Sequence, residues 1–67
     1  MSYVEVHPLE HSFLVRVVGA SEPREMVVTR AEFIGPMLGE IGVTSIGPWE
    51  DVTGEDGAEF KRAALIG

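Results

Sequence analysis

Residues 29–42 constrain the fold more than any other stretch, because their apolar residues recur at helical spacing. The apolar side chains concerned are Phe33, Ile34, Met37, Leu38 and Ile41. Positions i, i+1, i+4, i+5 and i+8 form one broad stripe along a helix, and such a stripe needs an apolar surface to pack against. We therefore expect this stretch to be helical and to lie on a β-sheet.

Signals for both ends of a helix are present in this stretch. Thr29, followed three residues later by Glu32, has the form of a capping box, in which the hydroxyl and the carboxylate bond to backbone N–H groups of the first turn. Gly42 supplies a stop, because glycine readily adopts the left-handed conformation that ends a helix.

Pro36 argues against one smooth helix. Proline has no N–H to donate and its ring crowds the preceding turn, at a cost of about 3 kcal/mol in a helix interior. We therefore expect a short kinked or split helix, with a helical turn near residues 30–34 and a second short helix over residues 36–41.

The chain before this stretch alternates between apolar and polar residues, which is typical of half-buried strands. The expected strands cover residues 3–7, 12–18 and 24–28 and form an antiparallel meander. Val4 and Val6 share one face of the first strand, and in the second strand Phe13, Val15 and Val17 should face the helix. Leu14 and Val18 then lie on the opposite face beside Arg16, so we expect a homodimer or a C-terminal segment to cover that face.

The chain after the helix is expected to contain a short fourth strand over residues 43–46 and an acidic, glycine-punctuated loop over residues 50–57. Residues 58–66 remain open between two structures. Their composition favours a helix capped by Asp56, whereas the turn residues before them equally suit a hairpin. The predicted fold is a single small α+β domain over residues 1–67.

The charge distribution restricts the class of partner. The 67-residue chain has a net charge of −6, and residues 31–60 contain seven acidic residues and no basic one. Binding to nucleic acid or to an anionic membrane depends on lysine and arginine, so neither is expected, and a basic protein surface is favoured. The N-terminus lacks a signal-peptide pattern and no run reaches the roughly 20 apolar residues of a membrane span, which predicts a cytoplasmic protein.

No residue pattern indicates catalysis or a bound cofactor. The chain has no cysteine, and its serines lie in strand or turn contexts without a neighbouring base. His7 and His11 are separated by Pro8, which opposes the helix that would bring them together on a metal. The acidic loop does not fit the calcium-binding pattern, since Asp56 stands where that pattern requires glycine if Asp51 is its first residue. We therefore expect no enzyme activity, no cofactor and no metal.

Trp49 lies directly before the acidic loop and is the residue that most suggests binding. Aromatic side chains flanked by charge are enriched at protein interfaces, although Trp49 could equally cover the small core and the loop could serve only for solubility. The candidate partner-binding residues are Trp49, Glu50, Asp51, Glu55 and Asp56.

These features predict a small, acidic, non-enzymatic binding protein that docks on a basic surface of a larger protein as an inhibitor or accessory factor. Phages and mobile elements encode many such proteins, including inhibitors of host defence complexes, and the analogy is one of size and charge. The alternative is a self-assembling structural subunit of a virion or scaffold, joined through the outer sheet face.

Overall fold

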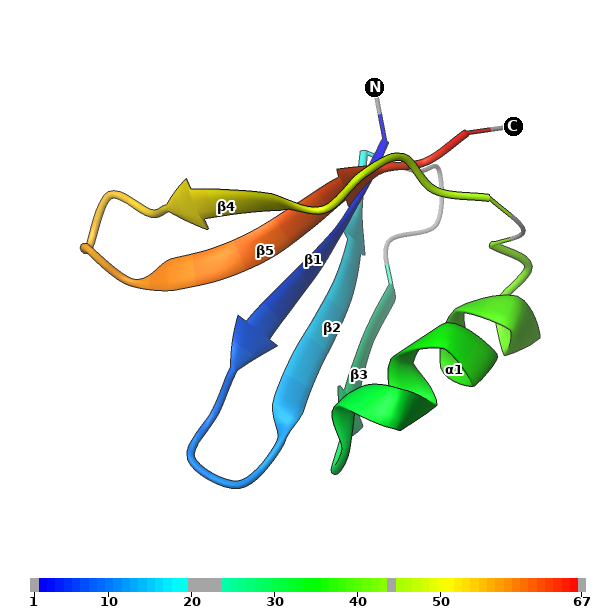
Figure 1. Cartoon of the computed structure of the whole chain (residues 1–67), viewed down its shortest axis with the longest axis horizontal. Helices are drawn as coiled ribbons and strands as arrows, with labels where there is room; N and C mark the ends of the chain where they lie inside the picture. Colours follow the sequence, from blue (N-terminus) through cyan, green and yellow to red (C-terminus); the bar gives the residue numbers. More distant parts are fainter. Residues whose placement is uncertain (1, 20–23, 44, 67) are drawn as a thin grey trace.

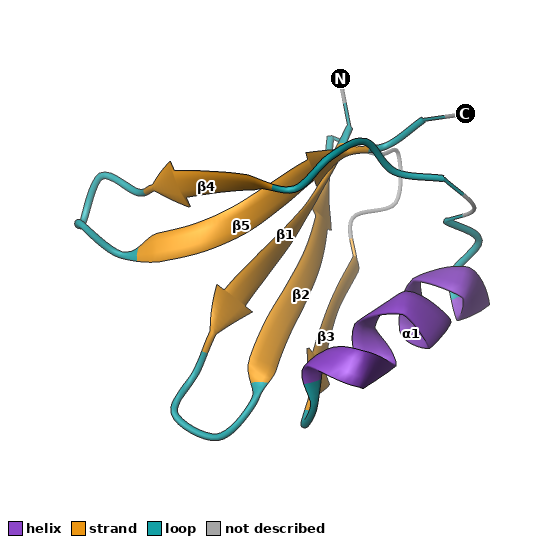
Figure 2. Ribbon diagram, viewed as in Figure 1, coloured by secondary structure: helices purple, strands orange, loops and turns teal. Residues whose placement is uncertain are grey.

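A five-stranded antiparallel sheet carries one short helix, as the computed structural model shows for residues 2–19, 24–43 and 45–66 (Figures 1 and 2). The elements in chain order are β1 (Tyr3–Pro8), β2 (Phe13–Val18), β3 (Arg24–Val28), the 3-10 helix η1 (Ala31–Phe33), α1 (Ile34–Glu40), β4 (Glu50–Thr53) and β5 (Glu59–Ala64). The strand order is β3-β2-β1-β5-β4. The expected α+β class is therefore correct.

The N-terminal meander forms as predicted, because its valines alternate in register across neighbouring strands. Val4 lies opposite Val17, and Val6 lies opposite Val15. All four are at most 8% exposed and form one core cluster, against which Phe13 packs. Residues 20–23, which connect β2 to β3, lie outside the described residues.

The helical stretch packs on this valine cluster through Met37 and Leu38, which are 8% and 4% exposed. Ile34 and Ile41 pack around them and are partly buried. Phe33 departs from the predicted stripe, since it belongs to the preceding 3-10 turn and is 47% exposed. We call the sheet face under α1 the helix-side face and the opposite face the outer face.

The two ends of the helical stretch differ in how well the sequence predicted them. The predicted capping box is wrong: Arg30 occupies the N-cap position of η1 in an extended conformation, without a side-chain cap. The predicted stop at Gly42 is confirmed. Gly42 has φ +89°, its N–H donates to the Gly39 carbonyl, and the Val43 N–H donates to the Leu38 carbonyl, as in a Schellman motif.

Pro36 lies in the first turn of α1, where a missing N–H removes little from the helical hydrogen bonding. The helical stretch is divided into η1 and α1, and the boundary falls at Ile34 rather than at the proline. None of the helices in the described part of the chain is long and apolar enough to cross a membrane.

Of the two structures left open for residues 58–66, the structure has the hairpin and not the helix, because β5 pairs with the free edge of β1 and its Ala63 is buried beside Val4. β4 and β5 form a hairpin. Around the expected strand over residues 43–46, Ile46 makes an isolated bridge with Leu65, and residue 44 lies outside the described residues. Since β5 lies within the sheet, this segment does not cover the outer face.

Candidate functional site

The β4–β5 hairpin diverges from the meander, and this divergence creates the candidate site. β1 pairs with β2 as far as Pro8, but it pairs with β5 only as far as the contact of Val6 with Lys61 (Figure 1). On the outer face the gap is bridged by the rings of His7 and Phe60, whose centroids are 4.3 Å apart. On the helix-side face the divergence leaves an open groove.

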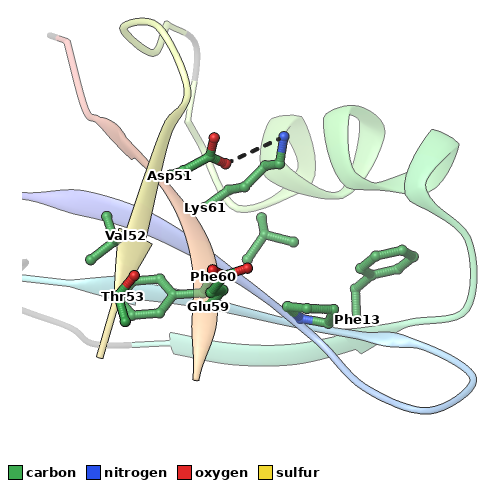
Figure 3. Close-up of a pocket in the computed structure, with 9 residues that line it drawn as sticks. Phe13, Asp51, Val52, Thr53, Glu59, Phe60 and Lys61 are labelled. Carbon is green, nitrogen blue, oxygen red and sulfur yellow. Dashed lines mark ion pairs between the residues drawn. The ribbon is translucent and has the colours of Figure 1, made fainter. Parts of the chain in front are cut away.

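Two adjoining pockets, of about 370 and 480 Å³, make up this groove. They share Val6, Phe13 and Lys61, which come from three different strands. The first pocket extends along the hairpin, where Asp51, Thr53 and Glu59 line it; Figure 3 shows Asp51 and Lys61 projecting together toward the helix side. The second extends toward α1 and is lined there by Ile34, Leu38, Ile46 and Trp49.

Trp49 stands at the end of the connection from α1, directly before β4 begins. Its side chain forms part of the groove wall together with Leu38 and Ile46. It is 42% exposed and lies outside the buried core cluster. The ring therefore offers apolar area to a ligand in the groove while part of it rests on the protein.

Two of the predicted acidic loop residues lie instead on a strand, so the predicted single loop is wrong. Glu50 and Asp51 are neighbours in β4, and alternation sends their side chains to opposite faces of the sheet. Glu50 lies on the outer face, 3.6 Å from Arg62 Nη2. Asp51 lies on the helix-side face, 3.7 Å from Lys61 Nζ. Each therefore has a basic neighbour on β5.

The other two acidic residues form the hairpin turn. Asp56 Oδ1 accepts a hydrogen bond of 3.1 Å from the Ala58 N–H, and the Gly57 N–H donates to the Gly54 carbonyl at 3.0 Å. Gly57 has φ +84°, a conformation that favours glycine, so the sequence specifies this turn locally. Asp56 thus has a structural role, whereas Glu55 is exposed at the tip of the turn.

Excess negative charge remains at the hairpin end of the groove. Four basic side chains are paired with carboxylates elsewhere or along the hairpin: Arg16 with Glu25, Arg30 with Glu32, Lys61 with Asp51, and Arg62 with Glu50. Within residues 2–19, 24–43 and 45–66, no ion-pair partner is found for Glu55 or Glu59. The hairpin therefore gives the groove an acidic rim.

Among the groove residues that were not predicted as site residues, three matter most for the argument: Phe13, Glu59 and Lys61. Phe13 was predicted only as core, although its place at the end of β2 leaves its ring partly buried at the edge of the cluster. Glu59 and Lys61 alternate along β5 and so share the helix-side face. That signal could have been found in the sequence only if residues 59–64 had been assigned to a strand.

The described residues contain no group of three or more histidine and carboxylate side chains placed to hold a metal ion. His7 Nε2 lies 2.9 Å from Glu5 Oε1, and His11 is almost fully exposed in the turn after β1. His7 therefore contacts Glu5, whereas His11 is exposed to solvent, and the two imidazoles do not form one site. Comparison of the chain with protein-family models, with curated proteins and with solved structures finds no match.

Proposed function

We propose that this protein is a non-enzymatic binding protein that docks on a basic surface of a larger protein as an inhibitor or accessory factor. The observation that supports this most directly is the partly exposed Trp49 on the wall of an apolar groove with an acidic rim. Such small acidic inhibitors are found among phage and mobile-element proteins, which is an analogy of size and charge alone.

The occupant of the groove is proposed to be a segment that carries an apolar anchor side chain next to lysine or arginine. Phe13, Leu38 and Trp49 provide apolar surface from which an anchor can displace water. Glu59 in the pocket lining, and Glu55 in the adjoining hairpin turn, have carboxylates without an ion-pair partner in the described part of the chain. The anchor then accounts for the lifetime of the complex, and the rim charges account for its rate of formation.

A peptide-display selection tests this proposal and does not require the natural partner to be identified first. The wild-type chain and the Trp49→Ser variant are immobilised separately, and peptides that bind only the wild type are sequenced. The expected winners combine an aromatic or large aliphatic residue with adjacent Lys or Arg. Winners without basic residues, or winners that bind both chains equally, would contradict the proposed groove.

The kinetics of one selected peptide separate the two contributions. Glu55→Gln combined with Glu59→Gln should slow association about 3- to 10-fold at low salt and weaken its salt dependence. Trp49→Ala should mainly speed dissociation, by about 30-fold if the ring is a hot spot of about 2 kcal/mol. Glu10→Gln combined with Glu40→Gln is the matched control, since it removes the same number of charges from two exposed carboxylates outside both pocket linings. An equal effect of this control on association would show that only net charge matters.

A further inference from the structure

The outer face carries a row of charges that crosses all five strands in register. The row consists, in strand order, of Glu25 (β3), Arg16 (β2), Glu5 (β1), Arg62 (β5) and Glu50 (β4). Each residue lies directly opposite the next on the neighbouring strand, so the sign alternates at every step. Three carboxylates and two guanidinium groups make the row nearly neutral, unlike the chain as a whole, whose net charge is −6.

Contacts within the face hold several of these groups in place. Arg16 Nε lies 2.7 Å from Glu25 Oε2, and the Arg62 guanidinium lies 4.7 Å from the centre of the Tyr3 ring. Glu5 is oriented by its 2.9 Å contact with His7. The charges are therefore ordered, and the two arginines remain accessible: the side chains of Arg16 and Arg62 are 40% and 36% exposed, whereas that of Glu5 is 18% exposed.

Apolar side chains flank the row on both sides. One band contains Tyr3, Val18 and Ala64, and the other contains Leu14, Val27, Val52 and Phe60, with the His7 imidazole between Leu14 and Phe60. Val27 is 61% exposed, which is the highest exposure among the large apolar side chains of the described residues. α1 packs on the other face of the sheet, through Met37 and Leu38. The outer face thus combines exposed apolar area with an ordered pattern of alternating charge.

We propose that the outer face binds a second copy of this chain, with a two-fold axis parallel to the strands and between β1 and β2. This axis places β1 of one copy over β2 of the other, and β5 over β3. Glu5 then faces Arg16 of the other copy, and Arg62 faces Glu25. In the apolar bands, Tyr3 faces Val18, and Phe60 faces the exposed Val27. Every charge of these four strands meets an opposite charge, which favours self-association.

Two other positions of the axis give less favourable contacts between the copies. An axis directly over β1 places Glu5 against itself and Arg16 against Arg62, which is repulsive. An axis between β1 and β5 pairs unlike charges but leaves Val27 outside the contact. The axis between β1 and β2 is therefore favoured, because it both pairs unlike charges and buries Val27, the most exposed of the large apolar side chains.

The size of the face sets the expected strength of the dimer. Only β3, β2, β1 and β5 overlap about this axis; four strands about 4.8 Å apart, each of about six residues, give a contact of roughly 20 by 19 Å, or about 750–800 Å² when both copies are counted. Interfaces of this size are weak and transient. The two copies also repel each other at long range, so association is measured near physiological ionic strength, where this repulsion is screened. Trp49 and the pocket toward α1 lie on the helix-side face and stay open in the dimer, whereas Val52 and Phe60 of the outer band also line the hairpin pocket.

Sedimentation velocity over a concentration series from about 10 μM to about 1 mM is the first test. The mass should rise from the 7.3 kDa of one chain toward twice that value. Val27→Asp should keep the chain monomeric throughout, whereas Leu9→Asp, at an exposed apolar residue in the turn after β1, should dimerise like the wild type. A wild-type chain that stays monomeric at the highest concentration overturns the proposal. So does a dimer that Val27→Asp leaves intact.

A charge exchange between two chains tests the position of the axis. Arg16→Glu alone and Glu5→Arg alone each place like charges across the interface, so each variant should be monomeric. An equimolar mixture of the two restores unlike charges across the proposed axis and should form a heterodimer. With the axis between β1 and β5 the mixture would stay monomeric, because the altered side chains would then face Glu50 and Arg62. Circular dichroism melts of both variants confirm folding, and an unrescued mixture of folded chains refutes the arrangement.

Discussion

Val15 is the residue through which the helix-side core can be tested most directly. It lies in the middle of β2, between Val6 on β1 and Met26 on β3, and it is 2% exposed. Val15→Ala removes two methyl groups from this site, and Val15→Asp introduces a carboxylate with no buried partner. Both changes leave the backbone pairing of β2 possible, so they test side-chain packing.

The expected magnitudes follow from burial. Two buried carbon groups contribute about 1.6 kcal/mol at about 0.8 kcal/mol each, and the cavity that remains raises the cost of Val15→Ala to roughly 2–3 kcal/mol. For a domain of this size, that corresponds to a fall in Tm of about 10–20 °C. A buried unpaired polar group costs roughly 2–7 kcal/mol, against a total stability of about 3–5 kcal/mol for so small a core, so Val15→Asp should unfold the chain.

Thermal melts followed by circular dichroism at low protein concentration measure both effects. Val27→Asp is the matched control, since Val27 is a valine on the neighbouring strand β3 but is 61% exposed on the outer face. It should change the free energy of unfolding by no more than about 0.5 kcal/mol. If Val15→Asp melts cooperatively within a few degrees of wild type, Val15 does not face the core and the reasoning is wrong.

Two further changes test the ends of α1 and the hairpin. Gly42→Ala should lower the free energy of unfolding by about 1 kcal/mol, because Gly42 has φ +89°, whereas Gly39→Ala should raise it by up to about 1 kcal/mol, since a Cβ at Gly39 would meet no atom within 4 Å; urea titrations that rank the two in the opposite order would contradict the Schellman ending. Asp56→Ala removes the acceptor of the Ala58 N–H and should cost about 0.5–1 kcal/mol, with faster hydrogen exchange in the β4–β5 turn. Unchanged exchange there would show that Gly54 and Gly57 close the turn without the carboxylate.

The meander and the end of the helix could be predicted from local sequence patterns. Alternation in residues 3–7 and 12–18 fixed which valines share the helix-side face, because the side-chain period of a strand is two and a shift by one residue would expose them all. Gly42 fixed the end of α1, since few other residues tolerate its conformation. These features depend on residues close together in the chain, so local chemistry was enough to predict them.

The N-terminal cap and the C-terminal strands were settled by contacts that local patterns do not encode. Residues 58–66 suit a helix as well as a strand, and the free edge of β1 decided in favour of β5, since pairing there satisfies backbone groups and buries Ala63. The same pairing moved Glu50 and Asp51 from the predicted loop onto opposite faces of β4.

The groove is likewise a product of tertiary structure. Its shared lining of Val6, Phe13 and Lys61 comes from positions far apart in the chain, and Trp49 reaches it through the connection that follows α1. The sequence identified Trp49 and the acidic character of this region. The ring lies in a cavity with acidic residues at its rim only because the hairpin diverges from β1. The point at which two strands diverge is set by long-range pairing, which local sequence patterns do not encode.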